Sequence, residues 1–369
     1  MKGVLGCPVL LAGSLGDAGR SLLRQAVPET GLSINAVESP GDVVEWMREN
    51  ETSAMLIDAD CETSRRAAMS VRTEAAYASV PIVGFSARPD DLGFADMFSW
   101  GGDDLVGTSA VWPLVHRLRA VRREPGSTVP VARIGRVLIG DAEVSRRLAI
   151  ARVVHNAGFD VSFSVERAEL LSRVAQDDPD LVVCGLDVAP DPAVMIREVR
   201  AKGLNALWIV LAPPRQATEV HRQVDGLAGV AVTDAFAPPE NVQFLLNELR
   251  NPVGQGRRAS KRLLYGTTVF FRGAGREEDD RGFCFNVSEG GLYVRTLAPP
   301  LDDLVWLEIT PPRSERRVRL VGKVAWRRWF GPNERATVPP GFGVAIVDGA
   351  QRDLQAWTDG YGAFLNALG

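Results

Sequence analysis

The first third of the chain alternates short apolar runs with stretches of helical periodicity. The apolar runs have the length of strands, and the segments between them, such as Gly41 to Glu49, carry apolar residues at the spacing of a helix packed on one side. Strands separated by helices predict a parallel sheet covered on both faces. The expected strands are residues 9–12, 33–37, 54–58, 81–86 and 104–106.

The same alternation begins again after a break at residues 124–130 that is rich in proline and glycine. The repeat is roughly one domain long, so the pattern predicts tandem copies of one flavodoxin-like α/β domain and not a solenoid. A second break follows at residues 251–256. The expected strands of the second copy are residues 136–139, 160–164, 181–184, 207–211 and 229–232.

The last third changes to a period of two, which predicts a small antiparallel β-barrel or sandwich. Residues 351–368 then place apolar side chains on one helical face, so we expect a C-terminal helix that packs on the barrel or on a partner. The expected domains are residues 1–124, 132–251 and 256–369. The expected strands are residues 267–271, 292–294, 304–309, 318–326 and 342–347.

Composition and charge narrow the class of protein. The four cysteines are scattered without C-x-x-C spacing, which predicts neither a zinc site nor a disulfide framework. No apolar stretch approaches the ~20 residues of a membrane span, and we expect a cytoplasmic protein. The net charge is −4, yet residues 257–347 hold 16 Lys and Arg against 10 Asp and Glu, so an anion would bind in this part.

Two motifs in the basic part carry the sharpest chemical signal. The first is R-x-x-x-R at Arg258 and Arg262, and the second is N-x-S-x-x-G at Asn286, Ser288 and Gly291. Together they resemble the PilZ domain, the receptor module for cyclic di-GMP, over roughly residues 256–348. The resemblance implies a ligand site formed by Arg257, Arg258, Arg262, Asn286, Ser288 and Gly291.

The residue types suit such a ligand on physical grounds as well. An arginine fork can pair with the O6 and N7 atoms of guanine, stack on its face or bind a phosphate. Asn286 and Ser288 are two positions apart on a strand and would project from one side, while Gly290 and Gly291 permit a turn or close backbone approach. The alternatives are a basic surface run and ordinary turn formers. The run from Trp326 to Trp329 could stack on nucleic acid, but core tryptophans explain it better, and we expect no nucleic-acid partner.

Both α/β copies resemble response-regulator receiver domains that have lost their chemistry. Phosphorylation of a receiver needs a nucleophilic aspartate, an acidic pair that holds Mg²⁺ and a lysine. In the first copy Asp58 and Ser86 stand at the nucleophile and hydroxyl positions, but Gly13 and Ser14 replace the acidic pair and Thr108 replaces the lysine. In the second copy Asp141 and Glu143 keep the acidic pair, whereas the nucleophile, hydroxyl and lysine positions are Gly185, Ala212 and the region of Ala237. Asp187, two residues beyond Gly185, could be proposed as a substitute nucleophile, but we interpret it as a polar residue at a strand-to-loop junction.

These observations predict a signalling protein and not an enzyme. The three histidines, His116, His155 and His221, are dispersed and form no catalytic or metal-binding pattern. We therefore expect a non-enzymatic cyclic di-GMP effector without a metal or other cofactor, with pseudo-receiver domains that bind signalling or motility proteins. The PilZ resemblance implies outputs such as motility, polarity, pili or exopolysaccharide. The alternative is a protein-interaction scaffold that needs no ligand.

Overall fold

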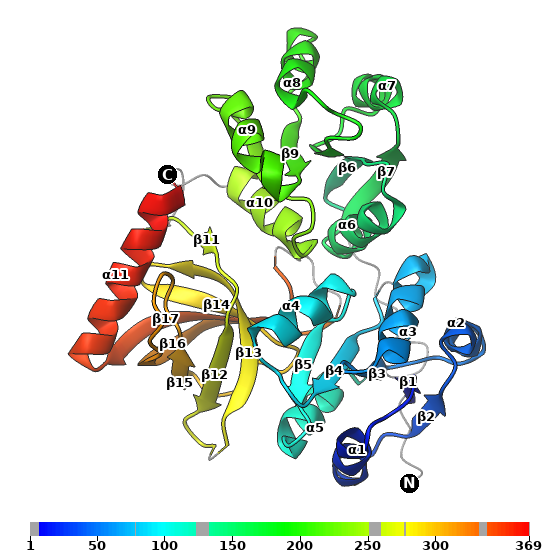
Figure 1. Ribbon diagram of the computed structural model, residues 1–369, viewed down its shortest axis with the longest axis vertical. Coiled ribbons are helices and arrows are strands. Elements are labelled where there is room, and N and C mark those ends of the chain that lie inside the picture. Colours follow the sequence, from blue (N-terminus) through cyan, green and yellow to red (C-terminus); the bar gives the residue numbers. More distant parts are fainter. Residues whose placement is uncertain are drawn as a thin grey trace. The chain divides into compact units, whose positions relative to one another are not determined.

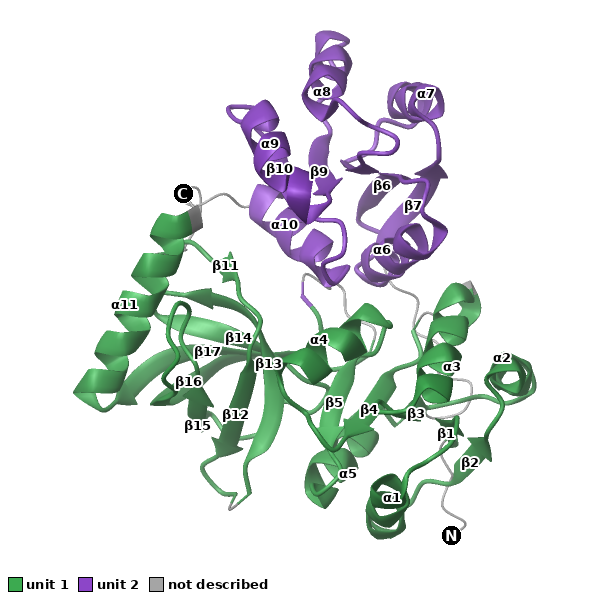
Figure 2. Ribbon diagram, in the orientation of Figure 1, with its two compact units in different colours: residues 1–128, 258–331, 339–369 green, residues 129–257, 332–338 purple. Residues whose placement is uncertain are grey.

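The chain folds into two parallel α/β sheets and one antiparallel barrel (Figure 1). The computed structural model describes residues 7–77, 79–122, 133–250, 260–276, 278–331 and 338–368. These elements form two compact units (Figure 2). The first unit combines the N-terminal α/β module with the barrel, and the second contains the central α/β module. Within the described ranges, no helix is both long enough and apolar enough to pass through a bilayer.

The N-terminal module is a five-stranded parallel sheet with the flavodoxin-like order β2-β1-β3-β4-β5. Four of its strands are buried along their whole length, which explains their continuous apolar runs. Gly31, with φ of 65°, ends the first helix, and the Asp90 side chain caps α4 by accepting from the Gly93 amide at 2.9 Å. The elements are β1 (Val9–Ala12), α1 (Asp17–Thr30), β2 (Ile34–Val37), α2 (Pro40–Glu49), β3 (Ala54–Asp58), α3 (Glu62–Thr73), η1 (Ala75–Tyr77), β4 (Ile82–Ser86), α4 (Asp91–Ser99), β5 (Asp104–Gly107) and α5 (Val111–Ala120).

The central module repeats this topology, with the order β7-β6-β8-β9-β10 and parallel pairing throughout. The carboxyl ends of its strands meet at one edge of the sheet, where α/β folds usually carry their chemistry. The elements are β6 (Gly135–Gly140), α6 (Val144–Asn156), β7 (Phe159–Ser164), α7 (Arg167–Asp177), β8 (Leu181–Gly185), α8 (Pro192–Ala201), β9 (Leu207–Ala212), α9 (Pro214–Val224), β10 (Val230–Asp234) and α10 (Glu240–Arg250).

The barrel closes through pairing of β13 with β14, in the ring β13-β12-β15-β16-β17-β14, and β11 adds to the side of β13. Alternate residues such as Val269, Phe271 and Leu307 fill its core, as the period of two predicts. Trp357 and Tyr361 of the C-terminal helix pack on the same core, so the predicted helix packs against the barrel. The elements are β11 (Leu263–Leu264), β12 (Thr268–Gly273), β13 (Asp280–Ser288), β14 (Gly291–Arg295), β15 (Leu304–Ile309), β16 (Val318–Arg328), β17 (Gly341–Gly349) and α11 (Gln351–Leu368).

Within the first unit, aromatic contacts join the barrel to the N-terminal module. The Phe283 ring on β13 stacks on Phe94 of α4, with ring centroids 5.4 Å apart, and meets Phe98 edge-on at 5.5 Å. The Arg295 guanidinium lies 3.6 Å from the centre of the Phe98 ring. The two modules therefore share a packed, partly apolar interface.

Candidate functional site

The second sequence motif forms the end of β13, the turn after it and the start of β14. Ser288 pairs with Gly291 across this hairpin, and its hydroxyl donates to the Gly291 carbonyl at 3.2 Å. A β-carbon on Gly291 would collide with the carbonyl oxygen of Val344 on the neighbouring strand β17. Barrel packing alone therefore accounts for glycine at position 291.

The first motif lies beside the second because β11 pairs with β13. Leu263 is opposite Val287, and Leu264 is opposite Asn286, in antiparallel register. The partly buried Arg262, which immediately precedes β11, is thus brought next to the strand that carries Asn286 and Ser288. Arg257 and Arg258 lie outside the described residues.

The motif residues differ in how far a ligand could reach them. Asn286 is only 4% exposed, whereas Ser288 is partly exposed and the turn at Glu289 and Gly290 is exposed. In this conformation the amide of Asn286 is largely covered by the protein. The accessible surface therefore consists of the hairpin turn, Ser288 and the approach to Arg262.

A buried ion network, not anticipated from the sequence, lies between the N-terminal module and the barrel. Arg117 of α5 is fully buried, and its Nε donates to Asp104 at 2.7 Å and its Nη1 to Asp280 of β13 at 2.9 Å. Further acceptors are the carbonyls of Pro113 and Arg281 and the hydroxyl of Thr296. All five guanidinium N–H groups are thus satisfied, and the two carboxylates raise the pKa of Arg117 against the effect of burial.

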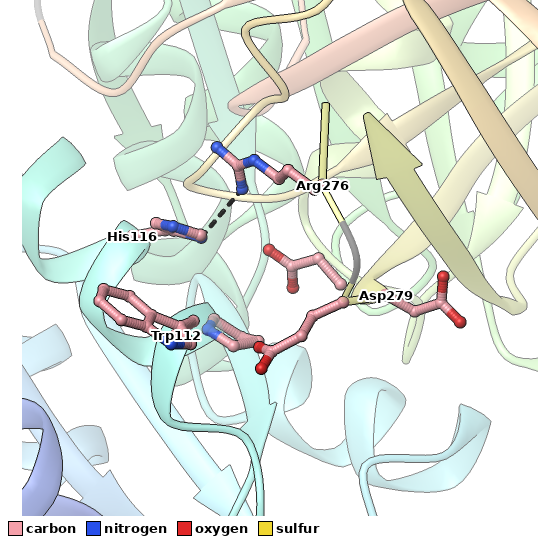
Figure 3. Close-up of a pocket in the computed structure, with 7 residues that line it drawn as sticks. Trp112, His116, Arg276 and Asp279 are labelled. Carbon is pink, nitrogen blue, oxygen red and sulfur yellow. Dashed lines mark hydrogen bonds between the residues drawn. The ribbon is translucent and has the colours of Figure 1, made fainter. Parts of the chain in front are cut away.

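Next to this network is a cavity of about 270 Å³ between α5 and the loop from β12 to β13 (Figure 3). Trp112 and His116 line one side, and Arg276 donates to Nδ1 of His116 at 3.0 Å. Burial, and then the charges of Arg276 and other arginines, lower the pKa of His116 to about 4. His116 is therefore neutral at pH 7 and serves as an acceptor in the interface, consistent with a structural role.

The carboxyl edge of the N-terminal sheet holds polar side chains that are hydrogen-bonded to one another and to the backbone. Asp58 accepts from the amides of Gly16 and Asp60, each at 3.1 Å, and Asp60 accepts from the Ser86 hydroxyl at 2.6 Å. Burial acts to raise the pKa of the Cys61 thiol, but hydrogen bonds, including those with Ser14 and Thr63, lower this pKa to about 7. Among the described residues, no group of three His, Cys, Asp or Glu side chains could hold a metal ion.

The corresponding edge of the central sheet contains its own cation. Arg146 of α6 binds Asp141 through two nitrogens, with Nε to Oδ2 at 2.6 Å and Nη2 to Oδ1 at 2.8 Å. The Asp187 carboxylate lies 3.9 Å from the same guanidinium and occupies the space that a side chain at Gly185 would need. Asp187 thus places a carboxylate at the nucleophile position, and the guanidinium of Arg146 compensates part of the negative charge of this edge. Asp141 and Glu143 indicated this edge in the sequence, but the sequence did not distinguish Arg146 from the other arginines in helices.

Comparisons with known proteins found similarity to solved structures at low sequence identity. No protein-family model matches the sequence, and no curated protein matches it. A Bacillus subtilis inhibitor of motility is 22% identical over 31% of this chain, with a TM-score of 0.24, and the chain spans 56% of that protein's length. The PilZ domain of CeSA from a cellulose-synthesizing bacterium is 15% identical, with 28% of this chain and 99% of that chain covered and a TM-score of 0.21. The pseudo-receiver domain of CikA is 18% identical, with 32% and 99% covered and a TM-score of 0.25. Both families that the sequence resembles thus occur among the solved structures similar to this chain.

Proposed function

We propose that the chain is a non-enzymatic cyclic di-GMP effector whose ligand binds at the hairpin of β13 and β14 and at the arginine segment that precedes β11. The pairing of Leu264 with Asn286 carries this proposal, because it brings together two motifs that are separated by more than twenty residues in the sequence. Arg262 and Ser288 then border a surface in the most basic part of the chain.

The chemistry of the ligand fits this arrangement. Arg257, Arg258 and Arg262 supply guanidiniums that can bind phosphate or a guanine edge, and the hairpin supplies a hydroxyl and backbone groups. Because Asn286 is largely buried, we propose that it contacts the ligand only if the hairpin opens, and that Ser288 and the turn make the first contacts.

The α/β modules would provide the output. We propose that residues 1–124 and 132–251 are pseudo-receiver domains that bind signalling or motility proteins, and that residues 256–369 form the sensor domain. Ligand binding would change which of their surfaces are presented to a partner. We also propose that the protein acts in the cytoplasm and needs neither metal nor nucleic acid.

Calorimetric titration of the full chain with cyclic di-GMP tests the proposal. Three proteins are compared: the wild type, the double variant Arg258→Ala/Arg262→Ala, and the control variant Arg319→Ala. Arg319 is an exposed barrel arginine outside both motifs. Charge-assisted hydrogen bonds contribute about 1.5–3 kcal/mol each, and about 1.4 kcal/mol is tenfold in Kd, so each motif arginine should account for a ten- to hundredfold change.

Binding by the wild type and by Arg319→Ala, with no heat in the double variant, would support the effector. If none of the three proteins gives heat of binding, cyclic di-GMP is not the ligand, and the ligand-independent scaffold is favoured. Binding that is equal in all three would mean that the ligand uses another surface.

A further inference from the structure

The C-terminal helix α11 is hydrogen-bonded to both motif segments. Tyr361 donates its hydroxyl to the backbone carbonyl of Lys261 at 2.7 Å, and Trp357 donates its indole Nε1 to the carbonyl of Glu289 at 2.8 Å. The two donors are four residues apart and so lie on one face of the helix. One helix face therefore holds the segment that leads into Arg262 and the turn that follows Ser288.

The two donors are themselves fixed by the barrel core. Trp357 is 2% exposed and Tyr361 is 4% exposed, and both belong to the core cluster of the barrel. Burial, and then the charge of Glu289, raise the pKa of the Tyr361 hydroxyl, which therefore remains protonated and able to donate at neutral pH. A buried aromatic side chain with a single polar atom makes a rigid anchor.

The two acceptors are backbone carbonyls immediately before Arg262 and before Gly290 of the hairpin turn. The carbonyl of Lys261 is part of the same planar peptide unit as the nitrogen of Arg262, so holding that oxygen fixes the plane from which the Arg262 side chain departs. The carbonyl of Glu289 likewise fixes the peptide unit that enters Gly290 in the hairpin turn. Together the two bonds set the direction of both segments relative to the core.

We propose that Tyr361 and Trp357 are positioning residues of the ligand site. They do not contact the ligand but hold its two binding segments in the conformation that binds. This inference rests on the proposed function. Because an ordered site loses less conformational entropy on binding, removal of an anchor weakens binding without removing any contact to the ligand.

The test is Tyr361→Phe, with Tyr265→Phe as its matched control. The Tyr265 hydroxyl also donates to a barrel carbonyl, that of Thr310 at 2.9 Å, and its ring packs on Phe364 of α11. Each variant keeps the ring and loses one hydroxyl, but only the Tyr361 acceptor lies in a motif. Both proteins are titrated with cyclic di-GMP, melted, and analysed by hydrogen exchange of residues 260–264 without ligand.

We expect Tyr361→Phe to raise the Kd about three- to tenfold and to accelerate exchange at residues 260–264, while Tyr265→Phe stays within about twofold of the wild-type Kd. Equal affinities of Tyr361→Phe and the wild type would overturn the inference while leaving the proposed function intact. Equal weakening by both variants would also overturn it, because a general loosening of helix packing would then be the cause. A wild type that does not bind cyclic di-GMP would overturn the proposed function and this inference together.

Discussion

The two α/β modules share one strand order but use an arginine in opposite ways. In the N-terminal module, Arg117 lies beside Asp104, the first residue of β5, and also binds Asp280 of the barrel. In the central module, Arg146 binds Asp141, which immediately follows β6. Because strands of a parallel sheet run in one direction, these arginines mark opposite edges of the two sheets.

The same sheet topology thus places an arginine either for pairing within the module or for pairing with another domain. Arg146 binds a carboxylate of its own module, at the edge where receiver chemistry would occur. Arg117 needs Asp280 and the Arg281 carbonyl, so its burial requires the barrel. Stability of the N-terminal module should therefore depend on the barrel, whereas Arg146 finds its carboxylate partner within the central module.

The largest effect is expected for Arg117→Met. Removing a buried cation leaves Asp104 and Asp280 uncompensated, which should lower the free energy of unfolding of the first unit by about 3–5 kcal/mol. Arg119→Met, which changes an exposed arginine of the same helix, should cost no more than about 0.5 kcal/mol. Tryptophan fluorescence during urea unfolding reports mainly on this unit, since Trp208 is the single tryptophan of the central module.

A second variant separates the charge effect from loss of packing. Addition of Asp104→Asn and Asp280→Asn to Arg117→Met removes the uncompensated charges and should recover part of the lost stability. If the triple variant is less stable than Arg117→Met alone, uncompensated charge is not the cause of the lost stability.

Much of the fold could be predicted because the hydrophobic period is a local signal. The strands at residues 9–12, 54–58 and 304–309 and the helix at residues 351–368 have the predicted limits. Contacts between distant residues could not be predicted in this way. Position 117 shares a helix face with the buried Leu114 and Leu118, but this spacing does not reveal the partner Asp280, which is 163 positions away.

The candidate site also has features that follow from local sequence signals and features that depend on contacts between distant residues. Its residue types were evident from two motifs, but the proximity of the motifs follows from the pairing of β11 with β13. The turn residues at 289–291 favour only the hairpin of β13 and β14. The burial of Asn286 and the anchoring of Lys261 and Glu289 by α11 depend on three-dimensional packing. Amphipathic spacing in the last helix predicted an apolar face that packs on the barrel or on a partner, but not the hydrogen bonds of Trp357 and Tyr361.

An intermediate effect is expected for Arg146→Met. An unpaired, fully buried Asp141 should cost the central module about 1–3 kcal/mol at pH 7, and hydrogen exchange of residues 133–250 would measure it. Burial already raises the pKa of Asp141, and loss of Arg146 should raise it further. A carboxyl whose folded pKa lies above its unfolded pKa is penalised as pH rises, so the variant should approach the wild type in acid. Arg173→Met, at an exposed ion pair, is the control and should change little.

A smaller, pH-dependent effect is expected at His116. Its pKa is about 4 in the folded protein, whereas an unfolded histidine has a pKa of about 6.5. Below pH 6.5 the unfolded chain therefore binds a proton that the folded protein does not, so this residue lowers stability as pH falls from about 6.5 towards 4. The wild type should lose more stability than His116→Gln between pH 7 and pH 5, with the exposed His221→Gln as control. Identical losses in wild type and His116→Gln would show that His116 takes up its proton at the ordinary pKa.

The smallest effect, no change at all, is expected when the protein is incubated with acetyl phosphate and Mg²⁺ and its intact mass is measured. In the N-terminal module, Gly13 and Ser14 offer no carboxylates to hold the metal, and both oxygens of Asp58 accept backbone hydrogen bonds. In the central module, Gly185 has no side chain that could accept a phosphoryl group. The Asp187 carboxylate near its position accepts from the Ala142 amide, and Arg146 binds Asp141 of the acidic pair. The control Asp58→Ala would reveal unspecific labelling. A phosphoryl group that is stable on the wild type and missing from Asp58→Ala would show that the N-terminal edge recruits a metal despite lacking the acidic pair. The N-terminal module would then be an active receiver, in contrast to the central module, whose acidic residue Asp141 is bound by Arg146.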